Sequence, residues 1–136
     1  MTISEFISNQ PAERQKLLSE INEIIILEDK NVKADIGPMM GKEMILYNAP
    51  GTFKYGLASV KQHMSLHLLP MYSSPQLYAK YKELLPDASF QKGCINFKSA
   101  KEMPFKIIKQ LMHDCSKIDL LKIREEYIKS KKKSPK

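Results

Sequence analysis

Residues 63–68, His63-Met64-Ser65-Leu66-His67-Leu68, alternate strictly between polar and apolar side chains. Because successive side chains of a β-strand point to opposite faces of its sheet, this period of two predicts a strand with one polar and one apolar face. Strands of this kind belong to antiparallel sheets that are covered by other elements on one face only. The segment therefore predicts a sheet with one packed face and one open face.

Three more strands are predicted upstream, in a region interrupted by glycine and proline. The interruptions between residues 31 and 70 leave no room for a helix; they are Gly37-Pro38, Gly41, Asn48-Ala49-Pro50-Gly51 and Gly56. They divide the region into strands over 32–36, 42–47, 53–60 and 63–69, joined by tight turns as an antiparallel meander. A further strand is expected within 90–98, with Cys94 and Asn96 on one side and Ile95 and Phe97 on the other.

Helical patterns flank these strands on both sides. Thr2-Ile3-Ser4-Glu5 fits a capping box, and Pro11 suits the first turn of a second helix. Helices are also expected after Ser74-Pro75, after Pro104 and, as an amphipathic stretch, from Asp119. The predicted fold class is α+β, a single antiparallel sheet with helices packed on one face and helices at both ends of the chain.

The positive charge is concentrated at the C-terminus. The 136 residues carry a net charge of +7, and residues 119–136, with seven basic and three acidic side chains, contribute +4 of it. We therefore expect one α+β domain over 1–118 and a C-terminal helix with a lysine-rich tail over 119–136. Such a tail can hold an acidic partner or nucleic acid. A frayed, solubilising terminus explains it as well.

The remaining composition indicates a cytoplasmic protein. Residues 24–27 form the longest aliphatic run, far short of the ~20 apolar residues that a membrane-spanning helix needs. The N-terminus has neither the basic nor the apolar region of a signal peptide. Cys94 and Cys115 offer at most one disulfide, and cytosolic thiols stay reduced. We expect no membrane partner.

Several side chains that can bind ligands lie on the predicted polar face of the sheet. His63 and His67 are four residues apart, about 13 Å in a strand, which is too far for both to bind one ion directly. If the strand with Cys94 and Asn96 pairs with the strand over 63–69, Cys94 and His67 meet on the open face. A solvated polar face explains the same residues without any ligand.

Tyrosines offer a second way to line such a site. Tyr47, Tyr55 and Tyr72 could surround a small-molecule cleft with the sheet as its floor, or be ordinary half-buried strand residues. The polar face and the tyrosines together predict a ligand-binding site at Tyr47, His63, His67, Cys94 and Asn96.

Support for catalysis is thin. Cys94 follows Lys92-Gly93, and a nearby lysine can lower the pKa of a thiol, but no base is identifiable beside it. The chain has no nucleophile elbow, no zinc-type cysteine pairing, no His-Glu-x-x-His helix and no dinucleotide fingerprint. No catalytic residue is predicted, and a binding protein is favoured over an enzyme.

The order of the segments resembles the YdhG-like domains, a family of small bacterial domains. His63–Leu68, the turn Leu85-Pro86-Asp87 and the strand Lys92-Gly93-Cys94-Ile95-Asn96-Phe97 are similar to that family's segments, and Gly37-Pro38-Met39-Met40-Gly41 falls where it often has a Gly-Met-Pro turn. The resemblance covers residues 3–116. It implies helices around an antiparallel sheet, a fold likened to frataxin, and most members of the family have no established activity.

The resemblance also makes iron a candidate ligand, because some members have been called iron chaperones. Frataxins are thought to hold iron on an acidic ridge of their first helix and adjoining strand. The corresponding acids here are Glu13, Glu20 and Glu23, but Lys16 lies among them and opposes a cation site. A solvated helix flank with a Lys16–Glu20 pair is the alternative. The sequence thus predicts a small binding domain for iron or a small molecule, or else an adaptor that acts through its basic tail.

Overall fold

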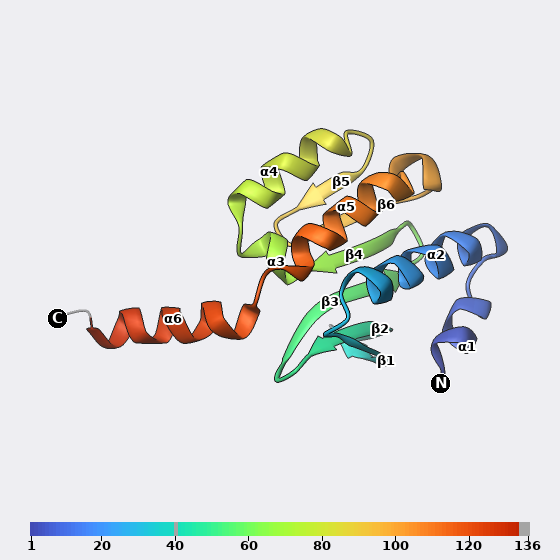
Figure 1. Cartoon of the computed structure of the whole chain (residues 1–136). Helices are drawn as coiled ribbons and strands as arrows, with labels where there is room; N and C mark the ends of the chain where they lie inside the picture. The colour runs from blue at the N-terminus through green and yellow to red at the C-terminus, as the bar shows by residue number, and fades with distance from the viewer. Residues whose placement is uncertain (40, 134–136) are drawn as a thin grey trace.

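A single six-stranded antiparallel sheet forms the centre of the protein (Figure 1). The computed structural model describes residues 1–39 and 41–133. The strands follow the order β1-β2-β3-β4-β6-β5 across the sheet. Their bounds are β1 Lys33–Met39, β2 Lys42–Ala49, β3 Thr52–Ser59, β4 Met64–Leu68, β5 Ser89–Gln91 and β6 Cys94–Phe97. The predicted α+β class with one antiparallel sheet is confirmed.

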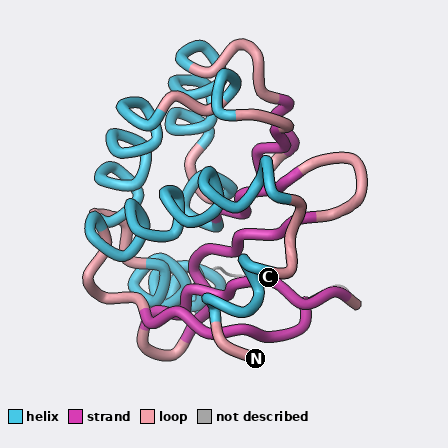
Figure 2. Tube along the Cα trace, turned by 90° about the vertical axis from the view of Figure 1, so that its right-hand side faces the viewer, coloured by secondary structure: helices cyan, strands magenta, loops and turns pink. Residues whose placement is uncertain are grey.

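The helices gather on one face of this sheet, as Figure 2 shows from the side. Their bounds are α1 Ile3–Ser8, α2 Ala12–Glu28, α3 Leu69–Tyr72, α4 Pro75–Leu84, the 3-10 turn η1 Ala100–Glu102, α5 Phe105–Ser116 and α6 Leu120–Lys133. The predicted capping box is present at α1, where the Glu5 backbone N–H donates to Thr2 Oγ1 and the Thr2 N–H donates to Glu5 Oε1.

The core lies between the sheet and the helices α2 and α5. One cross-strand row of fully buried side chains runs through the four inner strands: Ile45, Leu57, Leu66 and Ile95. The helices contribute buried side chains to the same core, chiefly Leu18, Ile21 and Ile25 from α2 and Ile108, Leu111 and Met112 from α5. Burial of these aliphatic groups supplies most of the driving force for folding.

Strand β1 corrects the predicted break at Gly37-Pro38. The strand continues through both residues to Met39. Pro38 is tolerated because β1 is an edge strand, where a missing N–H need not interrupt a ladder. A Cβ at Gly37 would lie 2.7 Å from Cδ1 of Leu46, so a larger residue there would force the Leu46 side chain to shift. Met40 of the predicted family turn lies outside the described residues.

The segments around β4 and β6 also differ from the prediction. Residues 90–98 contain the end of one strand and the whole of another, and β6 rather than β5 lies next to β4. His63 precedes β4, because its carbonyl accepts the Val60 N–H and closes the β3–β4 turn. Leu69 begins the short helix α3, and Pro70 suits its first turn.

Helix α6 extends away from the sheet (Figure 1). The Asp119 carboxylate accepts the Lys122 N–H at its start, and the helix continues into the lysines as far as Lys133. Near its start Leu121 lies over Gly51 of the β2–β3 turn. Residues 134–136 of the predicted tail lie outside the described residues. None of the helices described over 1–39 and 41–133 has the length and apolarity needed to cross a bilayer.

Candidate functional site

The pairing of β4 with β6 brings three of the five predicted site residues together. His67 lies opposite Cys94, and Ser65 lies opposite Asn96. Because Leu66 and Leu68 of the same strand are buried in the core, His67 and Ser65 point to the face away from the helices. Strand β5 extends both rows, with Gln91 beside Cys94 and Ser89 beside Asn96. The predicted juxtaposition of His67 and Cys94 is therefore present.

We define the polar strip as Ser65, His67, Cys94, Asn96 and Gln91. Two hydrogen bonds link side chains within it. The Ser65 hydroxyl donates to Asn96 Oδ1 over 2.6 Å. The Cys94 thiol donates to Gln91 Oε1 over 3.7 Å. Both bonds join neighbouring strands, and Ser65, Cys94 and Asn96 are buried or half-buried. The strip is partly desolvated and still reachable from solvent.

The ionisable groups of the polar strip are neutral near pH 7. Burial lowers the pKa of His67, which favours the uncharged imidazole. Burial also raises the pKa of the Cys94 thiol. Desolvation is the cause that shifts this pKa, and no lowering by a neighbouring lysine contributes to it. The thiol donates to an amide oxygen and has the properties of a hydrogen-bonding group rather than a nucleophile.

An apolar shelf adjoins the polar strip on the same face of the sheet. Met44 and Ala58 are buried there, on the opposite side of their strands from the core residues Ile45 and Leu57. A Cβ at Gly56, which lies opposite His67, would come within 3.1 Å of both Met44 Sδ and Phe53 Cζ. The side chains of Met44 and Phe53 therefore pack over the backbone of Gly56. The result is a shallow surface, apolar over β2 and β3 and polar over β4 and β6.

Two of the predicted site residues, Tyr47 and His63, lie outside the polar strip, as do the other tyrosines considered for a cleft. Tyr47 is fully buried on the helix-covered face, where its hydroxyl donates to Asn22 Oδ1 over 2.6 Å. Tyr55 lies beside it and is also fully buried, so neither tyrosine lines a cleft over the open face. His63 lies in the β3–β4 turn, and the Arg14 guanidinium reaches its carbonyl oxygen at 3.5 Å. Tyr72 is exposed and packs over Gly93.

The acidic residues of α2 do not converge on a common point. Glu13 and Glu23 are exposed, and Glu20 is half-buried. Glu20 forms the predicted i,i+4 ion pair with Lys16, whose Nζ lies 4.0 Å from Glu20 Oε1. Over residues 1–39 and 41–133, no group of three or more His, Cys, Asp or Glu side chains is placed to hold a metal ion. The described residues give the iron hypothesis no geometric support.

A buried charged cluster on the covered face was missed by sequence reasoning. The register of β2 and β3 shifts between Tyr47 and Asn48, so Lys54 is the extra residue of a β-bulge. Its ammonium lies 2.7 Å from Asp29 Oδ2, and the Tyr55 hydroxyl donates to the same oxygen over 2.6 Å. Burial and this bond both raise the pKa of Tyr55. The only signal in the sequence is a lysine among strand-forming residues.

Comparison of the chain with known proteins identified no relative. Searches against protein-family models, curated proteins and solved structures found no match to the chain. The resemblance to YdhG-like domains stays a prediction. The candidate site therefore depends on the residues and contacts described above.

Proposed function

We propose that the protein is a non-enzymatic binding domain that holds a small uncharged ligand on the open face of its sheet. The polar strip is the binding site, with His67, Cys94 and Asn96 as its main contacts. The observation that carries the proposal is the β4–β6 register, which sets His67 beside Cys94 and Asn96 beside Ser65 on the face that faces away from the helices.

The chemistry of the strip favours an uncharged ligand over an ion. Asn96 and Gln91 each offer an amide donor and a carbonyl acceptor, and a neutral imidazole offers one of each. Within the described residues, the amide nitrogen of Asn96 makes no hydrogen bond to the protein, so one donor is free for a ligand. The adjoining shelf of Met44 and Phe53 suits a flat apolar ring. We infer a planar heterocycle of about the size of a nucleobase.

The test is a titration of the ¹⁵N-labelled protein with adenine, cytosine and uracil, followed by amide chemical shifts. We expect saturable shifts confined to β4, β5 and β6 for at least one compound. Asn96→Ala removes a hydrogen-bonding side chain and should weaken binding about tenfold. Asn48→Ala is the matched control, because Asn48 is exposed on β2, away from the strip. Absence of saturable shifts, or unchanged binding in Asn96→Ala, would contradict the proposal.

Helix α6 supports a second candidate, an adaptor that holds an acidic partner or nucleic acid. The helix leaves the body of the protein and carries six basic against two acidic side chains over 120–133. Ile123 and Ile128 are 42% and 43% exposed on it. Deleting residues 129–136 should abolish retention on immobilised DNA at low salt, and retention should fall steeply as salt is raised. Retention that survives the deletion would remove this candidate.

A further inference from the structure

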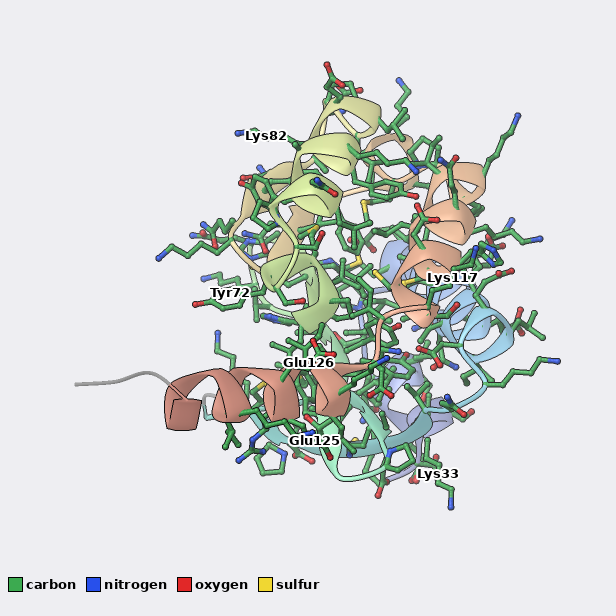
Figure 3. The ribbon with its side chains drawn as sticks, turned by 60° about the vertical axis from the view of Figure 1, so that its left-hand side comes forward. Lys33, Tyr72, Lys82, Lys117, Glu125 and Glu126 are labelled. Atoms are coloured by element: carbon green, nitrogen blue, oxygen red, sulfur yellow. The ribbon has the colours of Figure 1, made fainter. Side chains whose placement is uncertain are left out.

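A cleft of about 260 Å³ lies on the opposite side of the sheet from the polar strip, at the link between α5 and α6. The β2–β3 turn forms one wall of the cleft and the α5–α6 link forms another. Its lining is Asn31, Ala49, Pro50, Thr52, Lys54 and residues 116–121. Figure 3 shows Lys117 at this link, beside the start of α6. At ~30 Å³ per water, the cleft has the volume of about nine water molecules, or of one small organic molecule.

One of the residues that line the cleft, Lys54, carries a buried ammonium group. The Lys54 side chain is 5% exposed, and its Asp29 partner is 2% exposed. The β-bulge places Lys54 here, because the extra residue shares the helix side of the strand with Tyr55. A charge this far from solvent is retained only where it is paired and hydrogen-bonded.

The hydrogen bonding of this cluster leaves N–H donors of Lys54 without a protein acceptor in the described part of the chain. Asp29 Oδ2 accepts from both Lys54 Nζ and the Tyr55 hydroxyl, and Asp29 Oδ1 accepts from the Asn31 backbone N–H. An ammonium has three N–H donors. Among the described residues only Asp29 accepts from Lys54, so two of its donors have no protein acceptor. Because Lys54 lines the cleft, a ligand bound there is the candidate acceptor.

The rest of the lining indicates the charge and shape of the missing acceptor. Lys117 is exposed at the rim and makes no ion pair with any residue in the described part of the chain. The Asp119 carboxylate accepts the Lys122 N–H at the α6 N-terminus, where the helix dipole offsets its charge. Pro50, Ile118 and Leu121 supply apolar surface. One negative charge and a short apolar chain would complete this environment.

We propose that this cleft binds a small aliphatic monocarboxylate, with its carboxylate on Lys54 and Lys117 and its chain against Ile118 and Leu121. Asp29 balances the charge of Lys54, and Lys117 balances the charge of the ligand. The site is independent of the polar strip, because it lies on the other side of the sheet and shares none of its residues.

The experiment titrates the full-length ¹⁵N-labelled protein with sodium butyrate at neutral pH and constant ionic strength. We expect saturable shifts of the Lys54 side-chain ammonium signal and of the backbone amides of residues 116–121. Butyramide, which has the same shape without the charge, is the matched ligand control. Sodium chloride at equal concentration controls for anion binding of any kind.

Two variants separate the site from the fold. Lys117→Gln is exposed and should fold normally while raising the dissociation constant about two- to fivefold, the range for one exposed ion pair. Lys54→Met removes the donor and should abolish binding, but it leaves Asp29 unpaired and can unfold the domain. Lys54→Met combined with Asp29→Leu leaves no unpaired charge in the interior. This double variant should fold and should not bind butyrate. Equal shifts with butyramide or chloride, or binding that survives in the double variant, would overturn the proposal.

Discussion

The two faces of the sheet hold their polar side chains in different ways. On the covered face, Tyr47 bonds to Asn22 of α2, and Lys54 and Tyr55 bond to Asp29, the residue that caps the C-terminus of α2, over 2.6 to 2.7 Å. On the open face, the side chains of Ser65 and Cys94 bond to the neighbouring strand and, within residues 1–39 and 41–133, to no other element. A covered face obtains its partners from a second layer, which fixes each group. The open face lacks these partners among the described residues, and the proposed function assigns its spare hydrogen-bonding groups to a ligand.

The comparison also explains why the two clusters differ in charge. Lys54 and Asp29 form an ion pair in the interior, with Lys54 Nζ 2.7 Å from Asp29 Oδ2, so each side chain compensates the burial of the other. The open-face strip has no such ion pair, and partial burial shifts the pKa of His67 and of Cys94 toward the neutral form. We therefore expect substitutions on the covered face to change mainly the free energy of unfolding, and under the proposed function those on the open face to change mainly ligand binding.

The largest expected difference is between the two thiols. Cys115 is fully buried in α5 and burial raises its pKa to about 12, whereas Cys94 is half-buried on the open face. We expect iodoacetamide at pH 8 to modify Cys94 at least about a thousandfold faster than Cys115, which reacts only when the fold opens. Peptide mass spectrometry over time measures both rates, and in urea they should become equal. Equal rates in the native protein would refute the assigned burial.

The next effect in size is the loss of the buried ion pair. Asp29→Ala leaves the Lys54 ammonium buried without compensation and should lower the free energy of unfolding by about 3–5 kcal/mol. Urea denaturation measures this change. Glu20→Ala, which breaks the exposed pair with Lys16, should cost only about 0–1 kcal/mol and is the control. A cost below that of the control would show that the cluster is not a closed ion pair.

A smaller difference is expected between single hydroxyl deletions on the two faces. Tyr47→Phe removes a bond to Asn22 on the covered face and should cost about 1–2 kcal/mol. Ser65→Ala should cost about 0.5–1 kcal/mol, because water can reach the half-buried Asn96 that loses its donor. Thermal and urea unfolding of both variants give the comparison. If Ser65→Ala cost more than Tyr47→Phe, the hydrogen bonds of the open face would contribute more to stability than those of the covered face.

The smallest effect is the pH dependence that His67 contributes. Its pKa is lower in the folded state than the ordinary value of about 6.5, so the unfolded chain binds more protons in acid. The contribution of neutral His67 to the free energy of unfolding is present above about pH 6.5 and is lost as the pH falls through the pKa of His67 in the folded protein. Urea midpoints at a series of pH values should therefore fall more steeply for the wild type than for His67→Gln. Identical slopes would contradict the burial of the imidazole.

The sequence anticipated the open-face strip because the alternation over 63–68 is unambiguous. His67 and Cys94 could be placed on one face, and only the pairing of their strands was open. The sequence left the role of Tyr47 open, because this residue follows Met44, Ile45 and Leu46, an unbroken apolar run that does not show which side chains face the core. The predicted break at Gly37-Pro38 failed because the edge position of β1 depends on the rest of the sheet.

The local structure follows from short-range sequence patterns: the strand period, the apolar stripes of α2 and α5 and the capping box of α1. Those features depend on residues within a few positions of one another, so the pattern of side chains predicts them directly. The strand order, the bulge at Lys54 and the cluster of Lys54 with Asp29 and Tyr55 depend on how the whole chain packs. Those features join residues that are 25 or more positions apart, and their stability comes from shared burial that no local pattern records.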